Sequence, residues 1–530
     1  MSFPSSPERG LARRDTLLLF GMGLLVALAV AALQPVPGYM DAAYYFAGGI
    51  RLAGGHGFTE TIAWNYLNHP QALPQPSHAY WYPLASLVAA AGMSLTGRID
   101  FVAARIFFVL IAAAFPPIIA TLAYRLCPKR RIAIAAGFLA IFSGFYLPFI
   151  VTTDNYAIYF FLGGIFFLLL DRYKVSLALP LGLIAGLLNL ARGDGLLWLP
   201  LTLFIVTWTA YRSSGAASPG KRILFAAFNA LLAFLGYLLV MGPWMARNWT
   251  VFGTLLPPGT NQVLWMTNYG QTFSFTPEQY TFQTLLATGW SEILKVRSLA
   301  LWENFTTAIS AEGMLFFFPF ILIGIWRLRR SFLVQMAGLG WLLLLLAESI
   351  LFPFASIRGG FFHAGAAFQP VWFALVPIGL ESVIEWSAKR NPRLVRLAPA
   401  LQAGVVILAV VFSGMLVKVR VLDSGWNEGE YIYQRAEQLL DENGALPGDV
   451  VVTRNPPAYF VMTGRSAIVL PDGGEEALLA AARRFNAHYL VLEKPETGQL
   501  ANLYQDPESN PVFTYIGAVD DAHIFLINEP

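Results

Sequence analysis

Three acidic residues of the N-terminal half lie beside long apolar runs, where ionisable side chains are rare. They are Asp41, Asp154 and Asp194. An ionisable group in or near a membrane span is costly, and by default it marks a functional site. A carboxylate in such a place could act as a general base or hold a divalent cation such as Mg²⁺ or Mn²⁺. We take Asp41 and Asp154 as candidate catalytic residues and Asp194 as a candidate substrate-binding residue.

Several cationic and histidine side chains could accompany these acids. Arg192, Arg247 and Arg358 are candidate substrate contacts, because a guanidinium group binds phosphate or carboxylate through two parallel hydrogen bonds. His78 follows a Pro-rich segment and His363 follows Gly359-Gly360. Both histidines could contact a substrate or a metal ion, although histidines in loops more often hold the loop itself.

Each candidate also has a structural interpretation, which stays open at this point. Asp154 could cap the helix that follows it. Asp194 could form an ion pair with Arg192. Arg247 and Arg358 could anchor the chain to lipid headgroups.

The composition excludes an ordinary soluble enzyme. Of 530 residues, 56% are hydrophobic and 13% are charged, and the mean hydropathy is +0.56, whereas soluble domains carry about 25% charged residues. The single cysteine, Cys127, excludes an intramolecular disulfide framework. Apolar runs near the length of a membrane span occur about eleven times, at roughly 16–34, 101–124, 132–151, 156–170, 175–191, 196–210, 223–243, 313–326, 332–352, 366–386 and 397–417.

The Lys and Arg clusters predict the orientation of these spans. With a cytoplasmic N-terminus, every cluster falls on the cytoplasmic side, as the positive-inside rule requires; the clusters are Lys129-Arg130-Arg131, Arg172 with Lys174, Arg212 with Lys221-Arg222, Arg327 with Arg329-Arg330, and Lys389-Arg390 with Arg393 and Arg396. This agreement requires 80–97 to be an interfacial or re-entrant helix. This orientation predicts two large outer loops, at about 35–100 and 244–312.

Residues 421–530 differ from the rest of the chain. They hold 6 Lys/Arg against 17 Asp/Glu, whereas residues 1–420 hold 29 against 15. Patterns of alternating strands and helices predict a small α/β domain outside the membrane, with helices at 427–443 and 475–485, strands at 449–453, 467–470 and 488–492, and a closing hairpin at 512–516 and 523–527. We therefore divide the chain into a membrane domain, 1–420, and an extracytoplasmic domain, 421–530.

The order of these motifs resembles the C-type membrane glycosyltransferases, and in particular protein O-mannosyltransferases and lipid A aminoarabinose transferases. An acid after the first span is followed by Tyr44-Tyr45, by Gly54-Gly55-His56-Gly57-Phe58 and by Tyr82-Pro83-Leu84. Asp154 matches the acid of the second outer loop in those families. Further similar segments are Leu190 to Gly195, Pro243 to Asn248, Asn455-Pro456-Pro457 and Thr463-Gly464-Arg465.

The resemblance implies a multi-pass protein of the cell membrane that transfers a sugar from a polyprenyl-phosphate donor, with inversion. Asp41 would be the general base, Asp154 would orient the acceptor or help hold a metal ion, and the arginines would stabilise the leaving phosphate. Membrane lipids are further partners, and nucleic acid is not expected. The acceptor (protein, lipid or glycan) and the sugar stay open.

One departure from the family pattern bears on the metal ion. The mannosyltransferases usually have a second acid directly after the first, where this chain has Ala42. The aminoarabinose transferases have an acid later in the same loop, where this chain offers Gln75, Ser77 and His78. Two rival classes are a transporter or lipid flippase, which the absence of a visible repeat disfavours, and a non-catalytic scaffold.

Overall fold

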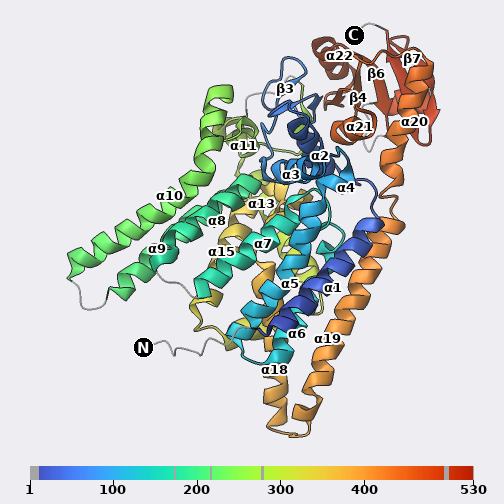
Figure 1. Ribbon diagram of the computed structural model, residues 1–530. Helices are drawn as coiled ribbons and strands as arrows, with labels where there is room; N and C mark the ends of the chain where they lie inside the picture. Colours follow the sequence, from blue (N-terminus) through green and yellow to red (C-terminus); the bar gives the residue numbers. More distant parts are fainter. Residues whose placement is uncertain (1–10, 172–174, 215–217, 276–279, 495–499, 529–530) are drawn as a thin grey trace. The chain divides into compact units, whose positions relative to one another are not determined.

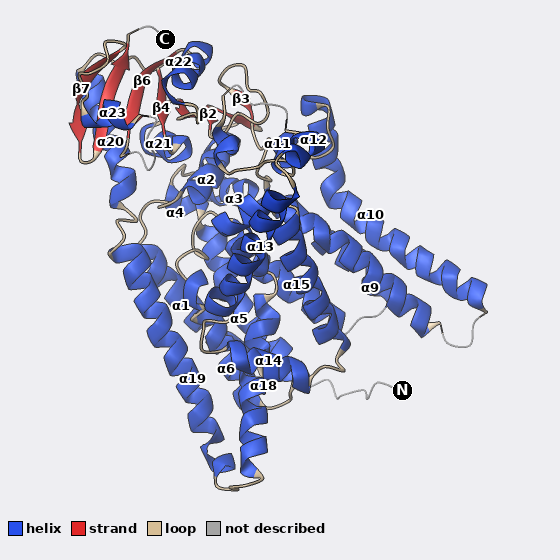
Figure 2. Ribbon diagram, turned by 180° about the vertical axis from the view of Figure 1, so that it is seen from behind, coloured by secondary structure: helices blue, strands red, loops and turns tan. Residues whose placement is uncertain are grey.

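The computed structural model describes residues 11–171, 175–214, 218–275, 280–494 and 500–528, and it divides the chain into two compact units. We call them the helix unit, which is Met1–Leu33, Phe108–Trp244 and Arg297–Arg420, and the sheet unit, which is Gln34–Phe107, Met245–Val296 and Val421–Pro530. Arg172 and Lys174, which belong to one predicted cytoplasmic cluster, lie outside the described residues. All the strands belong to the sheet unit (Figure 2).

The helix unit is built from long apolar helices (Figure 1). Its main elements are α1 (Arg13–Ala32), α5 (Ile106–Leu126), α6 (Arg130–Ile141), α7 (Asn155–Asp171), α8 (Ala178–Ala191), α9 (Trp198–Ser213), α10 (Pro219–Phe252), α13 (Trp290–Thr307), α14 (Phe318–Arg327), α15 (Phe332–Ile350), α17 (Phe361–Gly365), α18 (Gln369–Ala388) and α19 (Leu394–Val417). Three of them, α5, α10 and α13, begin or end in the sheet unit.

Within the described residues, seven helices are long and apolar enough to cross a membrane. They are Arg13–Ala32, Phe101–Leu126, Gly193–Ser213, Pro219–Phe252, Phe332–Ile350, Gln369–Ala388 and Leu394–Leu422. Shorter apolar helices occupy three further predicted spans, at Asn155–Asp171, Ala178–Ala191 and Phe318–Arg327. The predicted polytopic α-helical fold is confirmed.

Two predicted segments have a different form from a full span. The run 132–151 is α-helical only as far as Ile141 and continues through a short 3₁₀ helix, Gly144–Tyr146. The segment predicted as interfacial forms α3 (Leu84–Thr96), which has 13 residues. Such a helix is about 20 Å long, shorter than a bilayer core of about 30 Å. That this segment does not cross the membrane stays a prediction.

Glycines allow the helices of the helix unit to approach closely. A Cβ atom at Gly379 of α18 would lie 1.9 Å from the carbonyl oxygen of Phe320 in α14, and one at Gly182 of α8 would lie 1.9 Å from that of Ala233 in α10. Small residues at such contacts are typical of helix packing in membranes, where dispersion contacts replace the hydrophobic effect.

Ion pairs join four helices of this unit at the ends that the sequence places in the cytoplasm. Lys129 Nζ contacts Glu381 at 2.7 Å and Glu385 at 2.9 Å, and Arg327 reaches Glu385 at 2.7 Å. Arg130 pairs with Asp15 of α1 at 2.6 Å. The carboxylates of α1 and α18 are thus neutralised by the cationic clusters that predicted the orientation.

The sheet unit combines the first predicted outer loop and most of the second with the C-terminal segment; residues 297–312 of the second predicted loop belong to the helix unit. Its helices are α2 (Met40–Ala53), α3, α4 (Phe101–Ala104), α11 (Pro258–Val263), α12 (Phe282–Ala287), α20 (Glu428–Glu442), α21 (Pro456–Thr463), α22 (Gly474–Phe485) and α23 (Ala501–Gln505). Its strands are β1 (Thr59–Glu60), β2 (Ile62–Ala63), β3 (Gln75–Pro76), β4 (Val450–Thr453), β5 (Ala467–Val469), β6 (Ala487–Leu492), β7 (Phe513–Val519) and β8 (Ala522–Ile527).

Six of the described strands form one sheet in the order β2-β5-β4-β6-β8-β7, and β1 and β3 form a separate antiparallel pair. The pairs β2–β5, β5–β4 and β4–β6 are parallel, and β8 and β7 close the sheet as an antiparallel hairpin. Each helix and strand predicted from residues 427–527 is present within a few residues of its predicted bounds. The small α/β fold of the C-terminal segment is therefore confirmed.

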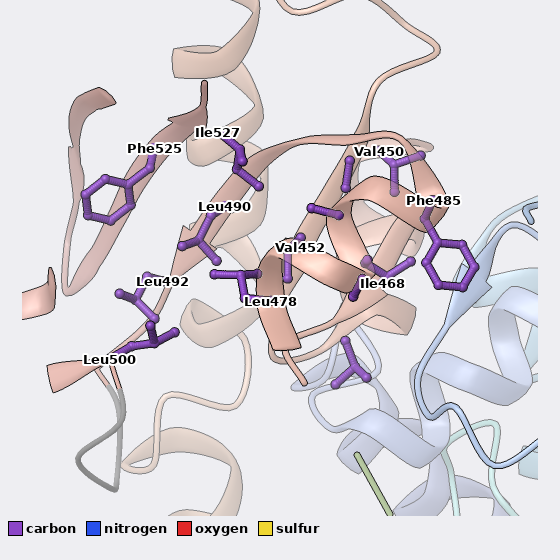
Figure 3. Close-up of a cluster of buried hydrophobic side chains, with 14 of the residues drawn as sticks. Val450, Val452, Ile468, Leu478, Phe485, Leu490, Leu492, Leu500, Phe525 and Ile527 are labelled. Atoms are coloured by element: carbon purple, nitrogen blue, oxygen red, sulfur yellow. The ribbon is translucent and has the colours of Figure 1, made fainter. Parts of the chain in front are cut away.

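The sheet has a hydrophobic cluster on each face. One cluster contains Val450, Val452, Leu490 and Phe525 with Leu478 of α22 (Figure 3). The other joins Val451 and Val491 to α20 and α21. Strand β2 belongs to the first predicted outer loop, and its Ala63 is buried in the first cluster. The loop therefore supplies part of the sheet as well as part of its core.

We predict that a charge at Ala63 destabilises the whole sheet unit. Ala63 is 0% exposed and pairs with Ile468 of β5, so Ala63→Asp buries an unpaired carboxylate. We expect a loss of about 3–5 kcal/mol, measured by thermal unfolding in detergent. Ala518→Asp makes the same change at an exposed position of β7 and should leave the unfolding temperature within about 2 °C. Equal losses for the two variants would contradict this role of β2.

Candidate active site

The helix unit brings together two of the predicted residues, Asp154 and His363. The Nε2 atom of His363 lies 3.0 Å from Oδ2 of Asp154. Asp154 is 1% exposed and directly precedes α7, while His363 is 8% exposed and lies in α17. The other carboxylate oxygen of Asp154 accepts from the backbone N–H of Asn155 at 2.6 Å.

The surroundings of His363 fix the direction of its ring. Nδ1 lies 2.9 Å from the carbonyl oxygen of Gly359 and 3.1 Å from the hydroxyl oxygen of Tyr156. The ring stacks on Tyr156, with centroids 4.0 Å apart. With the proton on Nδ1, the lone pair of Nε2 faces the Asp154 oxygen. Two acceptor atoms at 3.0 Å require a proton or a cation between them, and adjacent ligands of an octahedral cation at about 2.1 Å are about 3.0 Å apart.

A second polar cluster of the helix unit contains Arg192 and Asp194. The guanidinium group contacts Oδ2 of Asp194 at 2.8 Å and also donates to the carbonyl oxygen of Gly360 at 3.4 Å. Tyr159 donates to the other oxygen of Asp194 at 2.9 Å. The predicted ion pair is therefore present, and it ties the turn after α8 to the segment before α17.

Arg358 has a different environment from Arg192. It is exposed and lies in Ser356–Gly360, where Gly359 has a φ of +110°. Only glycine adopts that conformation readily. Arg358 and His363 therefore lie on one short segment, five residues apart.

In the sheet unit, Asp41 occupies the first turn of α2, two residues after the N-cap Tyr39. Acidic groups are favoured at helix N-termini, because the free backbone N–H groups and the helix dipole stabilise a negative charge. Asp41 is partly exposed, whereas the residues after it, from Ala42 to Gly49, are buried. The Asp41 carboxylate therefore lies at the partly exposed beginning of α2, whose following residues are buried.

His78 and Arg247 belong to a buried network of the same unit. His78 is 0% exposed and lies between the hydroxyl groups of Ser77, at 2.8 Å, and Ser86, at 3.0 Å. Burial, with the nearby charge of Arg247, lowers the pKa of His78 to about 3. Arg247 donates to the carbonyl oxygens of Ser77 at 2.9 Å and Phe58 at 3.3 Å, so it ties the end of α10 to the first loop.

No protein-family model and no curated protein sequence matches the chain. Among solved structures it is similar to ArnT from Cupriavidus metallidurans bound to undecaprenyl phosphate, with a TM-score of 0.55 and 14% identity over 97% of this chain and 98% of that one. It is also similar to the Archaeoglobus fulgidus oligosaccharyltransferase tethered with an acceptor peptide, with a TM-score of 0.56 and 14% identity over 91% and 69% of the two chains. The same archaeal protein in complex with Zn and sulfate gives a TM-score of 0.54 at 15% identity over 89% and 67%.

The chain has the C-type glycosyltransferase fold. This agreement confirms the resemblance inferred from the order of the sequence motifs. At such low identities it concerns the fold, and the chemistry must be argued from the side chains described above.

The chain also contains buried acidic residues that the sequence analysis did not select as candidate site residues. Glu348 is 3% exposed in α15, and Glu312 is 3% exposed at the end of the second predicted outer loop. Trp341 donates to Glu312 at 2.8 Å. Glu60 is buried in the first loop, where desolvation raises its pKa to about 8. The sequence did contain a signal for Glu348, which lies inside the apolar run 332–352. An acid in such a run is expected to be functional or paired.

Proposed function

We propose that the chain is a membrane glycosyltransferase that moves a sugar from a polyprenyl-phosphate donor to a hydroxyl group of an acceptor, which is a protein, a lipid or a glycan. The observation that carries the proposal is the Asp154–His363 pair, a buried carboxylate and imidazole at 3.0 Å in the helix unit. The fold supports it, because ArnT, whose structure was solved with undecaprenyl phosphate, aligns over 98% of its length. The archaeal relative was solved with an acceptor peptide.

Asp41 is the proposed general base. It takes the proton from the acceptor hydroxyl as the oxygen attacks the anomeric carbon of the sugar. The bond from that carbon to the phosphate oxygen breaks, and polyprenyl phosphate leaves with the bonding electrons. A single displacement of this kind inverts the anomeric centre.

Arg358 is the proposed first contact of the leaving phosphate. It is exposed on the segment that also carries His363, and a fixed cation stabilises charge that develops on a leaving oxygen. Arg192 and Arg247 already donate to protein acceptors, so we assign them chiefly to positioning. We assign His78 the same role, because its ring is fully buried.

The metal proposal concerns Asp154 and His363. Their facing oxygen and nitrogen atoms fit a divalent cation, since a carboxylate and an imidazole are ordinary ligands of Mn²⁺ and Zn²⁺. Such a cation would supply positive charge near the leaving phosphate. The archaeal relative was solved in complex with Zn and sulfate, which supports testing Zn²⁺ as well as Mn²⁺.

We also propose that residues 35–100, 244–312 and 421–530 lie outside the cytoplasm. A protein with Cys127 replaced by Ser would carry one new cysteine, at the exposed Arg329 or at the exposed Glu476. In intact cells an impermeant maleimide should label position 476 and not position 329, because only the former lies outside the membrane barrier. Labelling of position 329 alone would invert the orientation.

We predict that Asp41→Asn abolishes most sugar transfer, because the amide keeps the size of the side chain and removes its basicity. The expected loss in turnover is about 10²–10⁴-fold, measured in proteoliposomes as release of polyprenyl phosphate. Asp506→Asn, an exposed position of the sheet unit, serves as the matched control and should retain wild-type turnover.

Two results would count against this assignment. Turnover of Asp41→Asn within about threefold of wild type, far above the loss expected for a base, would remove Asp41 from the mechanism. Movement of the donor across the bilayer by the wild type, with no cleavage of the sugar–phosphate bond, would favour the lipid flippase.

We predict that Mn²⁺ or Zn²⁺ raises the unfolding temperature of the wild-type protein and not that of Asp154→Asn or His363→Ala. At a cation concentration of about 100 times Kd, binding stabilises the folded state by about 2.7 kcal/mol. His69→Ala removes an exposed histidine and should respond to the cation as the wild type does. Equal stabilisation of all four proteins would show that the cation binds elsewhere.

A further inference from the structure

The turn that carries Asp41 is packed against the beginning of the C-terminal segment, within the sheet unit. Gly38 has a φ of +81°, and a Cβ atom there would lie 2.0 Å from Nε1 of Trp426. The indole therefore occupies the space that any other residue at position 38 would fill. Trp426 also donates from Nε1 to the carbonyl oxygen of Val36 at 3.3 Å, and its ring meets Tyr39 edge-on at 5.4 Å.

Glu430 holds the same turn from α20. Its Oε1 atom accepts from the backbone N–H of Gly38 at 2.7 Å. Glu430 is 3% exposed, and its Oε2 atom is buried without a hydrogen-bond partner in the described part of the chain. Burying a carboxyl oxygen without a hydrogen-bond partner costs free energy, so a buried group of this kind calls for an explanation.

The environment keeps this carboxyl uncharged. Desolvation by burial raises the pKa of Glu430 to about 8, although the N–H group of Gly38 opposes the shift. At pH 7 the side chain is mainly the neutral acid, and it bonds the turn without placing a second negative charge near Asp41. A glutamine at this position reproduces the neutral acceptor.

The other side of Asp41 is also packed against the C-terminal segment. Ala43, two residues later, is 0% exposed in a cluster with Tyr433 and Ala436 of α20 and Tyr459 of α21. Contacts at Val36, Gly38, Tyr39 and Ala43 therefore fix the backbone on both sides of Asp41, and all of them come from residues 426–459.

We propose that Trp426 and Glu430 are positioning residues that hold the Asp41 turn, so that the C-terminal segment takes part in catalysis without touching the substrate. The inference rests on the proposed function, in which Asp41 is the base. A catalytic group must be held within a fraction of an ångström of its productive position, and a displacement of about 1 Å can cost on the order of 10²-fold in rate. The contacts of Trp426 and Glu430 supply that constraint.

The test compares Glu430→Ala with Glu430→Gln in the full-length protein in liposomes. Glu430→Ala removes the acceptor of the Gly38 N–H group, so kcat should fall about tenfold or more while KM for the donor changes by less than about twofold. Glu430→Gln keeps the acceptor and should restore kcat. Hydrogen exchange of residues 36–43 is measured on the same samples, and it should be faster in Glu430→Ala alone.

A matched control separates positioning from loss of stability. Leu478→Ala removes a buried side chain from the cluster on the opposite face of the sheet, and it should lower the unfolding temperature without changing kcat of the folded protein. If Glu430→Ala and Leu478→Ala lose kcat equally, or if Glu430→Ala exchanges faster at residues 36–43 with unchanged kcat, the inference is overturned.

The exchange measurement also separates this inference from the proposed function. A wild-type protein that cleaves no polyprenyl-phosphate sugar would refute the transferase activity itself. Faster exchange at residues 36–43 in Glu430→Ala would still support the holding of this turn by Glu430. Unchanged exchange in that variant would overturn the positioning role whether or not the wild type is active.

Discussion

The bilayer offers no hydrogen-bond partners, and this constraint governs the rest of the structure. Backbone groups inside hydrocarbon must be satisfied within helices, so the helix unit is a set of long apolar helices with glycines at its closest contacts. Polar chemistry is then confined to turns and helix ends. Asp154, Arg192 and His363 all lie at such places, and each has its partners within a few residues of a helix terminus.

Much of the architecture could be predicted because its causes are local. Apolar length predicts spans, cationic clusters predict the ends that carry Lys129 and Arg327, and alternation predicts the strands of residues 449–527. Lys129 and Arg327 of these clusters also form ion pairs with Glu381 and Glu385 of α18. That pairing could not be predicted, because it depends on which helices become neighbours in space.

The sequence allowed the residues of the candidate site to be selected, but it did not show which of them contact each other. Asp154 and His363 were both selected, yet nothing in a separation of 209 positions indicates that they meet. His78 and Arg247 were selected as candidate substrate contacts. The structure shows them bonded to groups of the first predicted loop, partners that the sequence does not indicate. Glu430 could not be recognised from the sequence, since its one distinctive property is the backbone N–H group that it accepts from.

The insertion of β2 into the C-terminal sheet has a consequence for the synthesis of the protein. Tyr66 bonds to Val469, 403 positions later, and β2 has no sheet to join until β5 has been made. Strand β2 must therefore stay without its partner strand while the helices between it and β5 are made. Domains generally fold in order from the N-terminus during synthesis. In this chain β2 cannot pair until β5 has been made, and a truncation that removed β5 would leave β2 without its partner strand.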